Sequence, residues 1–265
     1  MAEKKKPRVA ICKFTSCSGC QQALLNAEDR LAEVFAALDI VYFIEGQRTN
    51  LAGPYDLALV EGSISREEEI ERVKGLRAQT TTLIAVGACA VYGGPQALRN
   101  GADLRHLKEV SYERPGEIDA LDRTEGIDAY VSVDYRVYGC GPNPEQLMEV
   151  ISNVLQGRQP DLPQHCVCVE CKLAGHTCLL VAGGLACMGP VTVAGCGAAC
   201  PGSKRGCYGC FGPMSAPNAP ALARIFETLG KNPDDIVRMF RNQDSNAAAF
   251  KEVALAYAQK RRLAA

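Results

Sequence analysis

The residues of this chain best suited to chemistry are its 14 cysteines, which stand beside only 3 histidines. A cysteine thiolate binds zinc, holds an iron–sulfur cluster or forms a disulfide. Disulfide scaffolds are typical of short secreted chains, whereas this chain has 265 residues and starts with a charged segment, 1–7, without an apolar stretch or a twin arginine. We therefore expect a cytoplasmic protein whose cysteines are metal ligands.

Four cysteines follow predicted strands in short segments that contain glycine. They are Cys17, Cys20, Cys89 and Cys140. Because the carboxyl ends of parallel strands share one edge of a sheet, we expect these thiolates to converge there although they are far apart in the sequence. Alone, Cys17 and Cys20 could be a thioredoxin-like redox pair, and a buried cysteine could be a small core residue. Together the four favour a metal site, and zinc and iron both fit four thiolates.

A second segment, 168–210, contains eight cysteines, which make two further sets of four. They are Cys168, Cys171, Cys178, Cys187, Cys196, Cys200, Cys207 and Cys210. CxxC pairs at both ends and a CxxxCP pattern in the middle resemble ferredoxin ligand runs. Two structural zinc sites are the alternative, but three four-thiolate sites in one chain suit electron relay better than structural support.

The remaining cysteines and two of the histidines are not expected to be ligands. Cys12 lies within a predicted strand and is expected in the core, and Cys166 is surplus to the sets of four. His165 and His176 are expected to form hydrogen bonds in loops, because eight cysteines already supply two complete ligand sets.

Predicted strands and helices alternate over the first part of the chain. The strands are expected at 8–14, 40–44, 57–60, 81–86 and 130–133. The helices are expected at 21–38, 65–78 and 143–155. This alternation predicts an α/β fold with a parallel sheet covered by helices on both faces. The polar, poorly periodic segment 93–128 is expected to be a long insertion.

The composition changes after residue 157, where cysteines, glycines and prolines replace the alternating pattern. Two helical patterns, at 221–229 and at 233–263 with interruptions, close the chain. We therefore predict two domains, 1–157 and 158–265. The second would be a loop-rich metal-binding segment with C-terminal helices.

Two classes of partner are not expected. The stretch from Leu173 to Ser203 has no charged residue and is long enough for a membrane span, but its glycines and prolines would free backbone groups that lipid cannot satisfy. A formal net charge of −1 and an aromatic content of 6% argue against a nucleic-acid partner. We expect neither a membrane nor a nucleic-acid interaction.

Four motifs occur in a fixed order along the chain. They are Phe14-Thr-Ser-Cys17-Ser-Gly-Cys20-Gln-Gln, Gly87-Ala-Cys89-x3-Gly93-Gly94, Gly139-Cys140-Gly-Pro142 and Cys187-Met-Gly-Pro-Val-Thr192. With these motifs the chain resembles the small, electron-transferring subunit of [NiFe] hydrogenases, an oxidoreductase class that acts on H₂. The resemblance implies a flavodoxin-like first domain and a catalytic Ni–Fe centre in a separate large subunit. This chain would then relay electrons and would contain no catalytic residue of its own.

The resemblance also implies three [4Fe–4S] clusters and their ligands. The proximal cluster would be held by Cys17, Cys20, Cys89 and Cys140. The distal cluster would be held by Cys168, Cys171, Cys178 and Cys187. The medial cluster would be held by Cys196, Cys200, Cys207 and Cys210.

Two sequence differences from the membrane-bound members of this family indicate to which subgroup of hydrogenases the chain is most similar. Cys168 occupies the position of a histidine ligand, and Cys200 supplies a fourth medial thiolate. The chain looks most like the delta subunit of cytosolic NAD(P)-linked bidirectional hydrogenases, the sulfhydrogenase type. This implies an FAD- and NAD(P)-binding diaphorase subunit and a further Fe–S subunit as partners. Alternatives are the small subunit of a coenzyme F420-reducing or heterodisulfide-reductase-linked hydrogenase and, outside enzymes, a zinc-stabilised interaction module.

Overall fold

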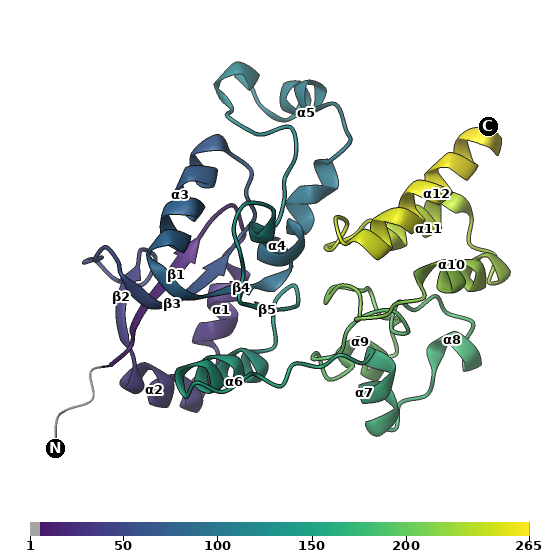
Figure 1. The fold of residues 1–265 in the computed structure, drawn as a ribbon. Helices are drawn as coiled ribbons and strands as arrows, with labels where there is room; N and C mark the ends of the chain where they lie inside the picture. The colour runs from purple at the N-terminus through teal and green to yellow at the C-terminus, as the bar shows by residue number, and fades with distance from the viewer. Residues whose placement is uncertain (1–5, 265) are drawn as a thin grey trace.

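The first part of the chain is a five-stranded parallel sheet (Figure 1). The computed structural model describes residues 6–264, apart from the side chains of 28, 29 and 262–264, so most of the charged N-terminal segment lies outside the described residues. The strands are β1 (Arg8–Lys13), β2 (Asp39–Phe43), β3 (Tyr55–Glu61), β4 (Thr80–Val86) and β5 (Tyr135–Val137). Their order, β2-β1-β3-β4-β5, is the flavodoxin-like order, and the expected parallel α/β sheet is confirmed.

Helices cover both faces of this sheet, with α3 above it and α2 and α6 below it in Figure 1. The helices are α1 (Gly19–Leu25), α2 (Glu28–Ala37), α3 (Glu67–Ala78), α4 (Gly87–Tyr92) and α6 (Pro144–Leu155). The side chains of successive residues of β1 point to opposite faces of the sheet, because side chains alternate along a strand. Val9 and Ile11 pack into the core that contains Leu147 of α6. Ala10 and Cys12 pack into the core that contains Val73 of α3, as expected for Cys12.

Three predicted elements differ from the structure. The predicted position of the fifth strand, 130–133, is wrong. The strand β5 starts five residues later and runs over Tyr135–Val137, whereas 130–133 is irregular chain that follows the short η3 helix (Ile127–Ala129). Val131 and Val133 nevertheless pack against the core, which gave the segment its strand-like pattern. The helix expected at 21–38 is broken at 26–27 into α1 and α2. The insertion is not wholly irregular, since it contains η1 (Gly94–Arg99), α5 (Leu104–Ser111) and η2 (Pro115–Glu117).

The second part consists of loops with short helices, followed by longer helices. The elements are α7 (Val167–Leu173), α8 (Leu179–Ala182), α9 (Ala199–Gly202), α10 (Ala219–Thr228), α11 (Pro233–Phe240) and α12 (Ala248–Ala264). Phe226, Phe240 and Phe250 centre a separate core, with adjacent ring centroids 6.2 and 5.7 Å apart. Within residues 6–264 no helix is both long and apolar enough to cross a bilayer.

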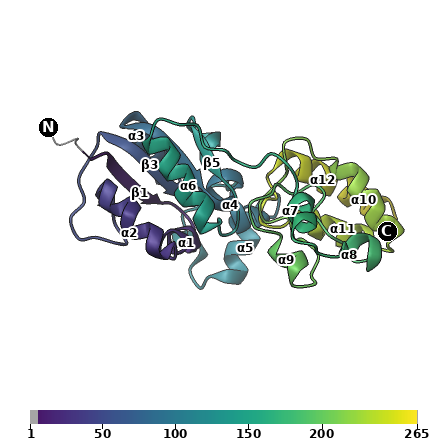
Figure 2. The ribbon, with the colours of Figure 1, turned by 90° about the horizontal axis from the view of Figure 1, so that it is seen from below.

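Hydrogen bonds fix the two parts against each other, and Figure 2 shows them lying side by side. The Asn143 side chain donates to the carbonyl oxygen of Gly195 at 2.9 Å. The loop between α11 and α12 also contributes, because the Asn246 amide donates to the carbonyl oxygen of Thr124 at 2.9 Å. The cysteine-rich loops therefore lie at a fixed place beside the sheet.

Candidate metal centres

The first thiol group lies at the carboxyl edge of the sheet and contains Cys17, Cys20, Cys89 and Cys140. Cys17 is in the loop after β1, Cys20 is in α1, Cys89 is in α4 directly after β4, and Cys140 follows β5. Burial, then the negative charges of Cys140 and Cys17, raise the pKa of the Cys89 thiol to about 12. Burial, then Glu61 and the thiolates of Cys89 and Cys140, also raise the pKa of Cys20. The structure thus brings the four strand-end thiols together, and metal binding, which needs thiolates, would release their protons.

Two glycines leave room around this first group. Gly87 (φ +84°) packs against the sulfur of Cys20, and Gly94 (φ +62°) packs against the sulfur of Cys89. A Cβ atom on either glycine would overlap the sulfur, and the left-handed backbone itself favours glycine. A donor set of four thiols in a glycine-lined space fits a bulky inorganic cluster.

Glu61 is a neighbour of the first group that sequence analysis missed. It ends β3, is 3% exposed and accepts a hydrogen bond from the Ser16 hydroxyl at 3.1 Å. Its second carboxylate oxygen has no partner among the described residues. Burial raises the pKa of Glu61, while hydrogen bonds from Ser16 and Cys20 lower it. The available signal was an acid that directly follows the apolar run 57–60.

The second thiol group contains Cys168 and Cys171 on α7, Cys178 at the start of α8, and Cys187 in the following loop. Burial raises the pKa of Cys168 to about 12, and the charges of Cys166, Cys187 and Cys171 contribute. The charges of Cys187 and Cys178 contribute, after burial, to the raised pKa of Cys171. The four predicted distal ligands are therefore neighbours, and the surplus Cys166 lies beside them. Cys178 is exposed to solvent.

The third thiol group contains Cys196, Cys200, Cys207 and Cys210. Burial raises the pKa of Cys210 to about 12, and the charges of Asp244, Cys196 and Cys200 contribute. Burial raises the pKa of Cys207 to about 12, and its sulfur accepts a hydrogen bond from the Gly209 N–H at 3.4 Å. The four predicted medial ligands thus also lie together.

Backbone groups connect the three thiol groups. The backbone of Cys140 in the first group lies beside the Cys210 thiol of the third group and lowers its pKa. The N–H of Cys207 in the third group donates to the sulfur of Cys187 in the second at 3.1 Å. The third group therefore lies between the other two.

Where side chains are described, no three His, Cys, Asp or Glu residues converge closely enough to hold one metal ion. Four thiolates around one zinc ion would have sulfur atoms only about 3.8 Å apart. The thiolates of a [4Fe–4S] cluster bind different iron atoms and stand farther apart.

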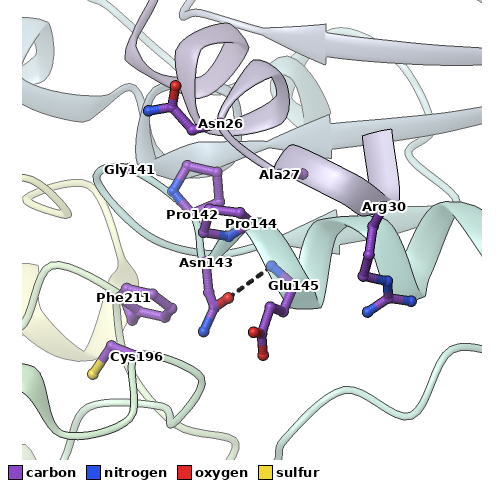
Figure 3. A pocket seen from close by; sticks show the side chains of 10 residues that line it. All are labelled: Asn26, Ala27, Arg30, Gly141, Pro142, Asn143, Pro144, Glu145, Cys196 and Phe211. Carbon is purple, nitrogen blue, oxygen red and sulfur yellow. Dashed lines mark hydrogen bonds between the residues drawn. The ribbon is translucent and has the colours of Figure 1, made fainter. Parts of the chain in front are cut away.

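A cleft of about 680 Å³ opens between the two parts of the chain, next to the first and third groups (Figure 3). Gly141, Pro142 and Asn143 line it on the side of the sheet, and Cys196 and Phe211 line it on the other side. The Asn143 carboxamide oxygen accepts a hydrogen bond from the N–H of Glu145 at 2.9 Å, which caps α6 at the cleft wall. The cleft gives the third group a surface opening at Cys196.

Comparisons with known proteins extend over both parts of the chain. Residues 17–154 match the family described as NADH ubiquinone oxidoreductase, 20 Kd subunit. The sulfhydrogenase 2 subunit delta of Pyrococcus furiosus is 29% identical over 234 residues, which cover 88% of this chain and 98% of that relative. A subunit of the F420-non-reducing hydrogenase of Methanocaldococcus jannaschii is 31% identical over 269 residues, covering 88% and 93%. A crystal structure of an NAD+-reducing [NiFe]-hydrogenase in the H₂-reduced state is similar with a TM-score of 0.55 and 27% identity, over 60% of this chain and 96% of that one.

Proposed function

We propose a function on the premise that this chain belongs to the NADH ubiquinone oxidoreductase 20 Kd subunit family and, within it, to the hydrogenase small subunits. The chain relays electrons between a Ni–Fe centre in a separate large subunit and a redox partner. Three [4Fe–4S] clusters, one for each thiol group, form the relay.

The observation that carries this proposal is that the third thiol group adjoins both of the others. The backbone of Cys140 lies beside the Cys210 thiol, and the N–H of Cys207 donates a hydrogen bond to the Cys187 sulfur. Such contacts keep successive carriers close, which an electron relay requires. The proximal, medial and distal clusters would accordingly bind to the first, third and second groups.

Residues other than the cysteines would shape the cluster site at the first thiol group. When bound, a [4Fe–4S] cluster supplies a one-electron carrier whose reduction potential depends on hydrogen bonds, charge and solvent exposure. Gly87 and Gly94 leave space beside the ligand sulfurs. The buried Glu61 carboxyl beside Cys20 adds a polar group that would tune the potential of this site.

An NAD(P)-linked complex is the assembly that we favour. The similarity to the NAD+-reducing [NiFe]-hydrogenase structure supports it. The partners would be the large subunit with its Ni–Fe centre, an FAD- and NAD(P)-binding diaphorase subunit, and a further Fe–S subunit, in the cytoplasm.

A second candidate is supported by the 31% identical relative from an F420-non-reducing hydrogenase. In that case the relay would serve a heterodisulfide-reductase-type partner instead of a diaphorase. The subunits that co-purify with the chain distinguish the two: an FAD subunit that reduces NAD(P) supports the first candidate, and its absence from an active complex supports the second.

The division into two domains, 1–157 and 158–265, stays a proposal. It is supported by cores that are centred on different residues, the sheet residues in the first part and Phe226, Phe240 and Phe250 in the second. Limited proteolysis between α6 and α7 would release two stable fragments if the division is correct.

The test of the relay uses Cys89→Ser in the anaerobically purified complex with the large subunit. We expect H₂-dependent dye reduction to fall, because electrons leave the Ni–Fe centre through the first group. H/D exchange, which needs no electron exit, should persist. Cys12→Ala, in the core of the sheet, is the control and should retain both activities. Unchanged dye reduction in Cys89→Ser would contradict the proposal.

A further inference from the structure

Glu170 joins the second and third thiol groups through its side chain. It lies on α7 between Cys168 and Cys171, yet its carboxylate reaches the loop that carries Cys196. Oε1 accepts a hydrogen bond from the N–H of Gly195 at 2.9 Å, and Oε2 accepts one from the N–H of Ala198 at 3.3 Å. Oε2 also lies 3.9 Å from the sulfur of Cys196.

The loop at 195–198 has a backbone that needs such an acceptor. Gly195, Gly197 and Ala198 have φ values of +129°, +64° and +53°, and Ala198 is fully buried. Residues that alternate between right-handed and left-handed conformations, or that form a turn, direct successive N–H groups towards one point and make a concave anion site. Here the Glu170 carboxylate occupies that site, while the backbone of Ala198 and Ala199 lowers the pKa of the neighbouring Cys196 thiol.

A left-handed alanine is a costly conformation that persists only when its surroundings hold it. The Glu170 carboxylate is the side chain that binds this loop from the helix of the second group. Its negative charge also lies beside Cys196, where it would disfavour an added electron at the third group.

We propose that Glu170 is a positioning residue for the third group: it fixes the Cys196 loop to the helix that carries Cys168 and Cys171, so that two cluster sites form as one unit. This inference rests on the proposed function, since it assumes clusters at both groups. Glu170 is then a residue outside the three thiol groups that affects both the assembly and the reduction potential of the medial cluster.

The test compares Glu170→Ala and Glu170→Gln with Glu149→Ala, an exposed glutamate of α6, in the anaerobically purified complex. Iron content and EPR-monitored redox titration are the readouts. Glu170→Ala should lose about four of about twelve iron atoms per chain, because the Cys196 loop is released. Glu170→Gln retains one acceptor oxygen, so it should keep its iron but shift the potential of the medial cluster upwards as the negative charge is removed. Glu149→Ala should match the wild type.

Wild-type iron content in Glu170→Ala, or an unshifted medial potential in Glu170→Gln, would overturn the inference. If Glu170→Ala does not fold, the potential measured in Glu170→Gln decides alone. A wild-type complex without iron–sulfur clusters would instead overturn the proposed function, so the two failures are distinct.

Discussion

The backbone N–H of Cys207 donates a hydrogen bond to the sulfur of Cys187 at 3.1 Å, although the two residues belong to different thiol groups. A peptide N–H directed at a thiolate stabilises its negative charge, and hydrogen bonds to sulfur are among the factors that set cluster potentials. One bond therefore both holds the second and third groups together and influences the potential of the second. Between the first and third groups, the backbone of Cys140 lies beside the Cys210 thiol and lowers its pKa.

Gly87→Ala should remove the cluster of the first group. The added Cβ would overlap the Cys20 sulfur, and the positive φ of +84° disfavours alanine as well. We expect loss of about one third of the bound iron, since one of three four-iron sites is affected. The measurement is the iron content of the purified complex.

Gly101→Ala is the matched control for this substitution. Gly101 also has a positive φ, +85°, but an added Cβ would meet no atom within 4 Å. It should lower stability by about 1 kcal/mol and keep all its iron. Equal iron content in Gly87→Ala and Gly101→Ala would show that the glycine beside Cys20 is not needed for the site.

Asp244→Asn should stabilise the protein at neutral and alkaline pH. Asp244 is 1% exposed, and neither of its carboxylate oxygens has a hydrogen-bond partner among the described residues. Burial raises the pKa of Asp244 well above its usual range. A raised folded-state pKa means that stability is fully present below about pH 4 and is lost as the pH rises towards that raised value.

We therefore expect a gain of about 1–3 kcal/mol for Asp244→Asn at pH 8 and a smaller gain at pH 5. Thermal loss of the visible cluster absorbance under anaerobic conditions measures it. Asp234→Asn, which removes an exposed ion pair with Arg261, should show no such increase with pH. A gain for Asp244→Asn that is independent of pH would contradict the assignment of a neutral, buried carboxyl.

Exposed apolar residues near the second group should contribute to docking of the redox partner. Leu173 and Val181, on α7 and α8, are 84% and 83% exposed, and Cys178 between them is exposed as well. Such a patch beside a redox site is typical of a protein interface. The double substitution Leu173→Ser and Val181→Ser should slow electron transfer to the protein partner while leaving dye reduction unchanged.

Leu255→Ser, at a 57% exposed position on α12, is the control for this pair and should affect neither reaction. If the double variant transfers electrons to its partner at the wild-type rate, the partner does not dock on this patch.

The sheet could be predicted because its strands are apolar runs separated by amphipathic helices. Four strands lie within one or two residues of their predicted limits. The fifth could not be placed, because Val131 and Val133 pack against the core, partly buried, from a loop and resemble a strand next to the short β5. Edge strands of three residues carry too little pattern to be distinguished from such a loop.

The first thiol group could be predicted because the topology of a parallel sheet brings strand ends together. The assignment of the other eight cysteines to two groups of four depended on the resemblance to hydrogenase small subunits. Loops have no sequence periodicity, so the sequence alone does not reveal which thiols are neighbours. Glu61 and Glu170 could not be recognised from sequence, because their roles depend on contacts with Cys20 and with the Cys196 loop. The ligand roles of the cysteines themselves stay predictions.

The metal content of the anaerobically purified complex distinguishes an iron–sulfur relay from a zinc-stabilised fold. Because three four-thiolate sites would each hold one [4Fe–4S] cluster, we expect about twelve iron atoms and twelve sulfides per chain, a brown colour and EPR signals on reduction. A colourless protein with stoichiometric zinc and no sulfide would contradict it and would favour a zinc-stabilised interaction module.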